Sequence, residues 1–225
     1  MSQSIIFCDF DGTITKEDTI DLLLTSYATE KWVTIEEMWE QGIIGSRECL
    51  EKQMDCVEYF SEKMLNNFID DAAIDESFIP FLKKIKQYKI NFYIVSDGFD
   101  LFINSILNKY NISGVKVFSN RLLLFKNKFK TFFPYYDSDC EAKSGLCKCN
   151  IVKNLGINRE IIYIGDGRSD LCGSKHASKL FAKNKLAKYC QDNKRDFISF
   201  ENFDQILSEL DLESDKIVKN ELVIR

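Results

Sequence analysis

The sequence predicts an α/β fold, in which a doubly wound, Rossmann-like parallel sheet carries a small α-helical cap inserted after the first strand. Three short apolar runs end in aspartate motifs and indicate the strands: 5–8 before Asp9, 90–95 before the SDG at 96–98, and 161–164 before the GDG at 165–167. Runs of β-rich residues bounded by Gly and Asp are typical of fully buried strands. Fully buried strands occur in parallel sheets that helices cover on both faces. In such sheets the ligand lies beyond the carboxyl ends of the strands, where all three runs place their aspartates.

Helical segments separate the predicted strands. We expect helices over 99–110 and 149–155, the second closed by Gly156 as its C′ residue, and a further helix over 203–212. Another short strand is expected over 180–182. Strands that alternate with helices favour the doubly wound α/β architecture.

The segment 118–136 predicts a β-hairpin. Its two apolar runs flank the tripeptide KNK at 126–128, and an asparagine between such runs indicates a turn. Pro134 is expected to end the second strand, because proline cannot donate a hydrogen bond to a neighbouring strand. The polar stretch from Glu213 onward is expected to fray.

Residues 16–75 predict a helical cap domain, which leaves 1–15 and 76–225 as the core domain. Apolar residues recur in this segment at helical spacing, with charged residues between them. They are Ile20, Leu23, Leu24, Tyr27, Ile35, Met38, Trp39, Leu50, Met54, Val57, Met64, Leu65 and Phe68. Both tryptophans of the chain, Trp32 and Trp39, fall in this segment, and we interpret them as packing residues.

Charge and composition argue against several classes of partner. The 225 residues carry a net charge of −5 with scattered lysines, whereas nucleic-acid binding needs clustered Lys and Arg. No run approaches the roughly 18 apolar residues of a membrane helix, and the N-terminus has neither the basic region nor the apolar stretch of a signal peptide. We therefore expect a cytoplasmic protein without nucleic-acid or membrane partners, whose eight cysteines are reduced. The oligomeric state stays open.

The motif DFDGT at 9–13 carries the strongest chemical signal. Asp9 and Asp11 are two residues apart at a strand end, so both carboxylates can point the same way. Held close together, they repel each other and attract a hard divalent cation. A carboxylate neutralised by a metal can attack a phosphate and form an aspartyl phosphate. Gly12 allows a sharp turn and the close approach of backbone amides to phosphate oxygens. The competing interpretation is an Asp-rich turn without chemistry.

Two further strand ends add polar groups. The motif GDGRSD at 165–170 supplies two more carboxylates, Asp166 and Asp170, between flanking glycines. After the second strand, the hydroxyl of Ser96 can hold a phosphate oxygen beside the two backbone amides that follow it.

Single residues complete the candidate set. Lys148 opens a short helix before the third strand and could neutralise the charge that spreads over phosphoryl oxygens. Lys143 competes for this role in the same loop. His176 is the only histidine of the chain, so the sequence offers almost no residues for a Ser-His-Asp mechanism. We interpret His176 as a surface or packing residue.

In their order along the chain, these segments resemble the four motifs of the haloacid-dehalogenase-like (HAD) phosphatases, over nearly the whole length. DFDGT together with GDGxSD is highly specific for that superfamily. The predicted cap is similar to the smaller cap of its subfamily IB, as in phosphoserine phosphatases. The resemblance implies Asp9 as the nucleophile, and Asp11 as the acid/base that protonates the leaving oxygen and then activates water. It also implies Mg²⁺ held by Asp9, the Asp11 backbone carbonyl and Asp166 with Asp170 in support, and a phosphoryl group bound by Thr13, Ser96, Asp97, Gly98 and Lys148.

A narrower resemblance comes from the segment 132–152. The residues that carry it are Phe133-Pro134, Cys140 and the GLCK motif at 145–148. They are similar to those of a cytosolic subgroup that includes the methionine-salvage phosphatase of 2-hydroxy-3-keto-5-methylthiopentenyl-1-phosphate. The subgroup also includes phosphatases of phosphoethanolamine, phosphocholine and pyridoxal phosphate, and its Cys-Lys pair favours Lys148 over Lys143. We therefore predict a Mg²⁺-dependent phosphomonoesterase of a small phosphate ester, with the methylthiopentenyl phosphate as the first candidate substrate.

Phosphoserine is the competing substrate. By the resemblance, the arginine that grips the carboxylate of phosphoserine falls on Glu51, and the acidic partner of its amine falls on Asp18. Glu51 would repel a carboxylate, although Arg47, one helical turn earlier, could substitute. Phosphoserine therefore ranks below the methylthio-sugar phosphate. The same site would also suit a phosphotransferase, whereas the intact acid pair argues against a non-enzymatic binding module.

Four cysteines near the predicted site allow two interpretations. They are Cys140, Cys147, Cys149 and Cys172. Such a group could bind zinc or form a redox-sensitive pair. No CxxC pair is present and the spacing matches no standard ligand set, so free thiols are favoured.

Overall fold

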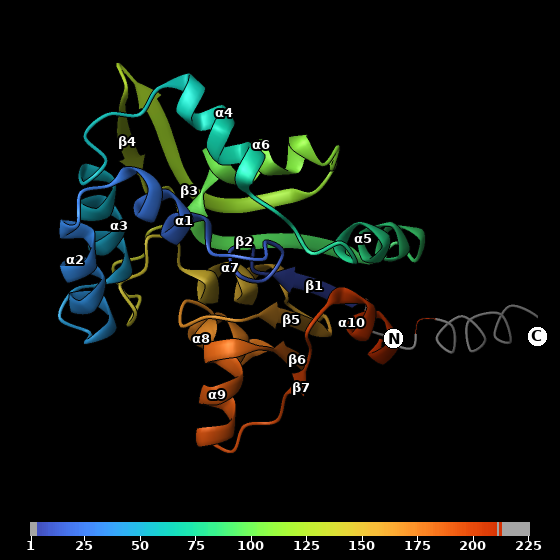
Figure 1. The fold of residues 1–225 in the computed structure, drawn as a ribbon. Helices are drawn as coiled ribbons and strands as arrows, with labels where there is room; N and C mark the ends of the chain where they lie inside the picture. Colours follow the sequence, from blue (N-terminus) through green and yellow to red (C-terminus); the bar gives the residue numbers. More distant parts are fainter. Residues whose placement is uncertain (1–3, 211, 213–225) are drawn as a thin grey trace, which may run out of the picture.

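The computed structural model describes residues 4–210 and 212. Within them, seven strands form one sheet in the order β4-β3-β2-β1-β5-β6-β7 (Figure 1). The strands are β1 (Ile5–Cys8), β2 (Asn91–Phe99), β3 (Lys116–Phe125), β4 (Lys128–Phe132), β5 (Ile161–Gly165), β6 (Lys179–Ala182) and β7 (Ile198–Ser199). Neighbouring strands are parallel except for β3 and β4, which are antiparallel. The predicted α/β class with its mostly parallel sheet is confirmed.

The register of the central strands brings the predicted motifs to one edge. Cys8, the last residue of β1, lies opposite Ile94 of β2 and Ile164 of β5. The residues that follow these three positions therefore emerge side by side at the carboxyl edge of the sheet. Strand β2 continues past the predicted end at residue 95, with a register shift between Val95 and Phe99, so the SDG motif lies inside the irregular end of this strand.

Helices cover both faces of the sheet. They are α5 (Phe78–Gln87), α6 (Asp100–Lys109), α7 (Lys148–Leu155), α8 (Asp170–Gly173), the 3-10 helix η1 (Ser174–His176), α9 (Asn184–Asp192) and α10 (Phe203–Glu209). Successive side chains of a strand point to opposite faces. Accordingly, Ile6 of β1 packs into the hydrophobic cluster of α5, α6 and α10, whereas Phe7 packs into the cluster of α7 and α9. The sheet is therefore doubly wound.

The observed helices differ from the expected ones mainly at their ends. The helix α7 begins at Lys148, one residue before the expected start, and ends at Leu155 as predicted, with Gly156 as its C-cap rather than its C′ residue. Gly156 has a φ of −86°, so this end uses no left-handed residue. The helix α10 ends at Glu209 rather than at 212. The stretch from Glu213, which is expected to fray, lies outside the described residues.

The predicted hairpin is present as β3 and β4. Both residues of its turn, Lys126 and Asn127, have positive φ angles, 48° and 58°. A two-residue turn of this kind matches the right-handed twist of the flanking strands. The first half of β3 also pairs with β2, a parallel pairing that the hairpin pattern did not predict. The hairpin thus extends the main sheet and forms its edge.

Four helices lie between β1 and α5, in the segment predicted to form the cap. They are α1 (Thr19–Tyr27), α2 (Lys31–Glu40), α3 (Ser46–Asp55) and α4 (Glu62–Asp71). Figure 1 shows α1, α2 and α3 gathered beyond the carboxyl ends of the strands, with α4 beside α6. The two connections between this segment and the sheet meet in an antiparallel bridge between Thr15 and Ile74.

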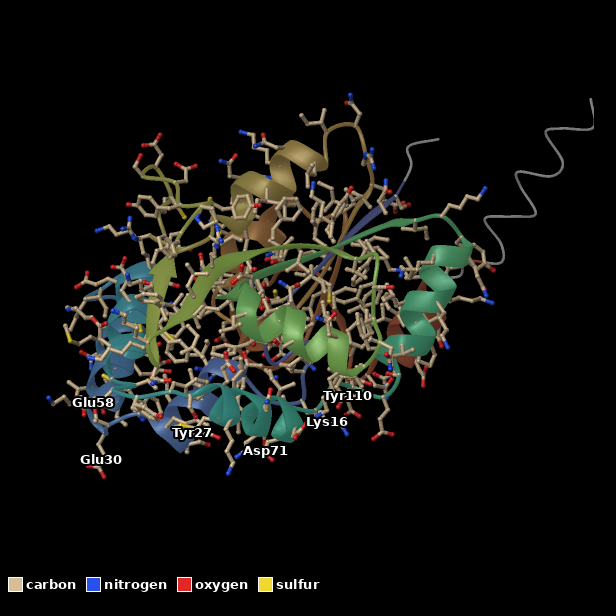
Figure 2. The ribbon with its side chains drawn as sticks, turned by 90° about the horizontal axis from the view of Figure 1, so that it is seen from above. Lys16, Tyr27, Glu30, Glu58, Asp71 and Tyr110 are labelled. Atoms are coloured by element: carbon tan, nitrogen blue, oxygen red, sulfur yellow. The ribbon has the colours of Figure 1, made fainter. Side chains whose placement is uncertain are left out.

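The segment containing α1–α4 shares a hydrophobic cluster with the sheet and its helices. Phe60 contacts Phe129 of the hairpin at 4.9 Å between ring centroids, and Phe68 contacts Phe102 of α6 at 4.8 Å. Near the return connection, Tyr110 donates its hydroxyl to the carbonyl of Ala72 at 3.4 Å. Figure 2 shows Tyr110 beside Lys16 and Asp71 at this point. The division into core and cap domains at 15/16 and 75/76 stays a prediction.

None of the helices in the described residues is long and apolar enough to cross a membrane.

Candidate active site

The structure brings the predicted Asp9 and Lys148 into direct contact. The Lys148 Nζ lies 2.9 Å from Asp9 Oδ1, and the amide of Phe10 donates to the same oxygen at 2.7 Å. Both side chains are buried, with 4% of Asp9 and 1% of Lys148 exposed. Among the described residues, the hydrogen bonds to this carboxylate all end on Oδ1. The second oxygen, Oδ2, is therefore available to another partner.

Lys148 is the cation of the site. Besides Asp9, it contacts Asp170 Oδ1 at 2.7 Å and Ser169 Oγ at 2.9 Å. Burial alone would lower the pKa of this amine, but the carboxylates of Asp170 and Asp9 outweigh burial and raise it. Lys148 is thus charged at neutral pH. The competing lysine, Lys143, lies exposed in the loop before α7.

Asp170 is a fully buried carboxylate with four donors. Its Oδ1 accepts from Lys148 and from the hydroxyl of Tyr163 at 2.7 Å, and its Oδ2 accepts from the amides of Asp166 and Gly167 at 3.1 and 3.0 Å. A buried carboxylate is stable only when its oxygens are satisfied in this way. Asp170 therefore fixes the loop after β5 as well as the amine of Lys148.

Three carboxylates form a candidate metal site. Oxygens of Asp9, Asp166 and Asp170 lie within 4.8 Å of one another. Burial raises the pKa of Asp9 and Asp166, and the neighbouring carboxylate of Asp170 raises both further. Three carboxylates against the single charge of Lys148 leave an excess of negative charge. All-oxygen donors with an excess of negative charge fit a hard divalent cation.

Two side chains orient Asp166 toward this group. The Thr13 hydroxyl donates to Asp166 Oδ1 at 2.8 Å, and Asn184 Nδ2 donates to Oδ2 at 3.3 Å. Gly12 lies against the same carboxylate with a φ of +68°, and a Cβ at this position would come within 2.6 Å of Asp166 Oδ2. Only glycine meets both demands, which explains the glycine of the DFDGT motif.

The carboxylate of Asp11 lies apart from the metal group and contacts the start of α1. Its Oδ1 accepts from the backbone amide of Thr19 at 3.3 Å and from the Thr19 hydroxyl, and its Oδ2 accepts from the Ser96 hydroxyl at 2.9 Å. A helix N-terminus favours a negative charge. Asp11 is therefore held between Ser96 at the end of β2 and the first helix of the predicted cap.

The SDG motif forms a narrow turn beside Asp11. The Gly98 amide donates to the buried Ser96 hydroxyl at 2.9 Å, and a Cβ on Gly98 would collide with Asp11. The carboxylate of Asp97 points elsewhere. It accepts from the Leu146 amide at 2.8 Å and Asn120 Nδ2 at 3.0 Å, and also from the Ser46 hydroxyl. Asp97 thus connects the predicted cap, β3 and the loop before Lys148.

A cavity of about 390 Å³ joins the strand ends to α1, α2 and α3. Its wall on the side of these helices, the predicted cap, is partly apolar and partly acidic and is formed by Asp18, Ile20, Asp21, Glu36, Trp39, Ser46, Cys49, Leu50 and Gln53. Burial raises the pKa of Glu36, whose Oε2 accepts from Gln53 Nε2 at 2.8 Å. Trp39 lines this cavity, whereas the sequence predicted only a packing role.

The three cap residues predicted to bind substrate occupy different places. Asp18 lines the cavity and caps α1, accepting from the amides of Ile20 and Asp21 at 2.8 and 3.2 Å. Arg47 and Glu51 are not among the cavity-lining residues. Instead, they pair with each other at 3.4 Å, and the Arg47 guanidinium lies 4.5 Å from the ring centroid of Tyr136.

Several residues of the site were not predicted. Thr19, Tyr163 and Asn184 hold the carboxylates of Asp11, Asp170 and Asp166. The sequence pattern shows Tyr163 only as part of an apolar strand, although a hydroxyl in a fully buried run requires a polar partner. Thr19 and Asn184 carry no local signal of this kind, because their partners lie in other segments of the chain.

All eight cysteines are free thiols. The Cys149 Sγ lies 3.0 Å from Nε2 of His176, the last residue of η1. Burial raises the pKa of Cys147 to about 12 and also raises the pKa of Cys149 and Cys172. Among the residues that the structure describes, the group able to hold a metal is the aspartate trio, and it includes no cysteine. The thiols are therefore not arranged as a zinc site.

Sequence comparison identifies the family. A model described as Putative Phosphatase matches residues 4–184, well over half of the chain. A Bacillus pumilus (strain SAFR-032) protein named 2-hydroxy-3-keto-5-methylthiopentenyl-1-phosphate phosphatase is 29% identical over 195 residues, covering 85% of this chain and 84% of its own. A protein of the same name from Bacillus thuringiensis subsp. konkukian is 28% identical over 209 residues, covering 91% and 94%.

Solved structures share the fold. A phospho-aspartyl intermediate analogue of phosphoserine phosphatase aligns with a TM-score of 0.71 at 21% identity, over 93% of this chain and 99% of its own. A HAD family hydrolase from Salmonella enterica subsp. enterica serovar Typhi aligns with a TM-score of 0.72 at 20% identity, over 92% and 71%. These likenesses show the fold, and the family model adds the activity. The chain belongs to the Putative Phosphatase family, is a phosphoric monoester hydrolase and shares the fold of these solved structures.

Proposed function

We propose that Asp9 is the nucleophile of a Mg²⁺-dependent phosphomonoesterase that works through an aspartyl phosphate. The contact between Lys148 and Asp9 Oδ1 carries this proposal. It neutralises one oxygen of a buried carboxylate that lines the cavity, while Oδ2 has no hydrogen bond among the described residues. A nucleophile held in this way meets a phosphate with reduced repulsion and fixed orientation.

The proposed reaction has two steps. Asp9 Oδ2 attacks phosphorus, and the bond from phosphorus to the ester oxygen breaks as Asp11 gives that oxygen a proton. Asp11, now a carboxylate, takes a proton from water. The resulting hydroxide attacks the phosphorus of the aspartyl phosphate, which releases inorganic phosphate and restores the Asp9 carboxylate. The contact of Asp11 with both Ser96 and Thr19 supports this role, because it keeps the carboxylate next to the phosphate-binding turn.

The phosphoryl group is proposed to bind at the end of β2 and next to α7. The Ser96 hydroxyl, the amides of Asp97 and Gly98, and the ammonium of Lys148 would donate there, with the Ser96 hydroxyl and the Gly98 amide turning to the phosphoryl oxygens from their present bonds to Asp11 and Ser96. The Thr13 hydroxyl serves the phosphoryl group only indirectly, since it holds Asp166. Donors fixed before the substrate arrives stabilise the charge that develops on phosphoryl oxygens.

Mg²⁺ is the proposed cation. Asp9, Asp166 and the Asp11 backbone carbonyl would hold it, with Asp170 in support, because Mg²⁺ prefers oxygen ligands from few carboxylates. When bound, the ion neutralises negative charge on the carboxylates and the phosphate. The excess of negative charge in the aspartate trio supports a divalent rather than a monovalent cation.

The substrate is proposed to be a small phosphate ester without a carboxylate. The relatives named for 2-hydroxy-3-keto-5-methylthiopentenyl-1-phosphate make that ester the first candidate, and the apolar side chains of Ile20 and Leu50 suit its uncharged organic portion. Phosphoserine is disfavoured, because Glu36 lines the cavity while Arg47 pairs with Glu51 outside it. The same acidic wall makes phosphoethanolamine and phosphocholine the second candidates, since their organic portions are cationic.

A metabolite screen tests the proposal. Purified protein with Mg²⁺ is incubated with p-nitrophenyl phosphate, with the methylthiopentenyl ester, and with phosphoserine, phosphoethanolamine and phosphocholine, and phosphate release is measured. We expect hydrolysis that EDTA stops, and a preference for esters without a carboxylate. Excess alcohol acceptor separates hydrolysis from phosphoryl transfer. Full activity in EDTA would exclude the proposed metal role.

A further inference from the structure

Arg168 connects the loop of the aspartate motif to the cap helices. It lies between Asp166 and Asp170 in sequence, but its guanidinium leaves that loop. Its Nη1 donates to the carbonyls of Trp39 and Glu40 at 3.0 and 2.6 Å. Its guanidinium carbon lies 5.3 Å from the centroid of the Trp39 ring. One side chain thus makes two hydrogen bonds and one stacking contact with the end of α2.

The loop after α2 satisfies part of this helix end, where the Gly42 amide donates to the Trp39 carbonyl at 2.9 Å. The last carbonyls of a helix meet no amide donor inside the helix and carry the negative end of its dipole. The last turn of α2 contains no basic residue of its own. Arg168 therefore supplies, from the core, the cation that the sequence of α2 lacks. Arginine suits this position, because its planar guanidinium can donate to two carbonyls and stack on an aromatic ring together.

The position of α2 matters for the cavity. Glu36 and Trp39 lie three residues apart on this helix and both line the cavity that holds Asp9. A second tie, between Lys185 and Glu40 at 3.0 Å, joins side chains that are 69% and 51% exposed. Exposed pairs of this kind contribute little. Arg168 is exposed as well, but it joins this helix end to the loop of Asp166 and Asp170 through two hydrogen bonds and a ring contact, whereas Lys185 makes one ion pair from α9.

We propose that Arg168 is a positioning residue that holds the end of α2 over the active site, and so places Trp39 and Glu36 against the substrate. The inference rests on the proposed function, since it concerns how that site receives its ester. Arg168 also lines the cavity, but its Nη1 donates to backbone carbonyls of α2, so we expect it to act on substrate binding through the position of Trp39 and Glu36.

The test follows two readouts in the full chain. The variants are Arg168→Ala, Arg168→Lys and the control Lys188→Ala, which removes an exposed cation from α9. With p-nitrophenyl phosphate, we expect Arg168→Ala to raise KM about tenfold, as for the loss of a charged hydrogen-bond donor, and to change kcat much less. Arg168→Lys should restore part of the loss, because lysine still donates to one carbonyl. The control should match the parent protein.

The second readout does not require activity. In a Trp32→Phe background, Trp39 is the only tryptophan, and acrylamide quenching of its fluorescence reports its exposure. We expect stronger quenching in Arg168→Ala than in the parent or in Lys188→Ala. If Arg168→Ala does not fold, Arg168→Lys decides by the same measurement.

The outcomes separate this inference from the proposed function. A parent protein that hydrolyses no phosphate ester would contradict the proposed function. Acrylamide quenching of Trp39 would still show whether Arg168 positions α2. An active parent whose KM and Trp39 quenching are unchanged in Arg168→Ala would overturn the inference alone.

Discussion

The floor and the cap-side wall of the cavity hold their charges in different ways. At the floor, formed by the strand ends, Asp9, Lys148 and Asp170 are buried and in contact with one another, and Asp170 alone has four donors. On the wall, Asp21 is exposed and the half-buried Glu36 bonds mainly to Gln53. Buried and fully bonded groups keep one geometry, whereas partly exposed groups can rearrange. In the proposed function, the floor therefore carries the chemistry and the wall selects the substrate.

The largest effect is expected for Asp9, the proposed nucleophile in the floor. Asp9→Asn should reduce hydrolysis of p-nitrophenyl phosphate by at least about 10⁴-fold, as for the loss of a catalytic nucleophile. The amide oxygen can still accept from Lys148, so the fold should persist, which circular dichroism checks. A folded variant with activity near that of the parent would remove Asp9 from its proposed role.

Removing the floor cation should affect stability as well as activity. Lys148→Met leaves two buried carboxylates without their partner, so we expect the free energy of unfolding to fall by about 3–5 kcal/mol. Urea unfolding measures the change. Lys143→Met is the matched control in the same loop, because this exposed lysine should change stability by no more than about 0.5 kcal/mol. Equal effects of the two substitutions would contradict the contrast between floor and surface.

A bound cation should stabilise the floor and leave the wall unaffected. At a free Mg²⁺ concentration about 100 times its Kd, binding to the folded state alone adds about 2.7 kcal/mol. Thermal unfolding with and without Mg²⁺ measures this gain. Asp166→Asn should remove most of it, whereas Asp192→Asn, an exposed change at the end of α9, should retain it. A gain that survives Asp166→Asn would place the cation elsewhere.

A change in the wall should alter selectivity more than catalysis. Glu36→Gln removes a carboxylate from the cavity, and we expect kcat/KM for phosphoserine to rise relative to phosphoethanolamine by about tenfold, or 1.4 kcal/mol. Hydrolysis of p-nitrophenyl phosphate should stay close to that of the parent. Glu37→Gln changes the neighbouring exposed residue and serves as the control. An unchanged ratio would mean that the wall charge does not act on the substrate.

The smallest effect concerns pH and stability. Burial raises the pKa of Glu36, so the folded state binds its proton more tightly than the unfolded chain does. Ionisation of Glu36 therefore lowers stability as pH rises from the ordinary glutamate pKa through the raised one. Glu36→Gln should gain Tm relative to the parent at about pH 8 but not at about pH 4. A Tm difference independent of pH, or one shared by Glu37→Gln, would contradict this.

The sequence predicted the floor better than the wall for a physical reason. Asp9 directly follows a buried apolar run and Asp170 lies in the motif that follows another, and parallel strands bring such positions to one edge. The partners of these carboxylates, such as Thr19 and Tyr163, are contacts across the fold and leave no local pattern. Helical periodicity placed Trp39 on an apolar face, but it could not show that this face borders a cavity rather than a neighbouring helix. Arg47 and Glu51 were placed by resemblance, whereas in the structure they pair with each other and do not line the cavity.

Asp11 belongs by sequence to the floor, yet Thr19 at the first turn of α1 holds one of its oxygens. In the proposed mechanism, this makes the proton donor sensitive to where the helical insert sits, although the nucleophile is not. An ester that enters while α1 is displaced would meet a competent attacking oxygen but a misplaced acid. The leaving alcohol would then depart only after α1 returns to its place beside Asp11. Recognition of the organic portion is thereby coupled to the timing of bond cleavage.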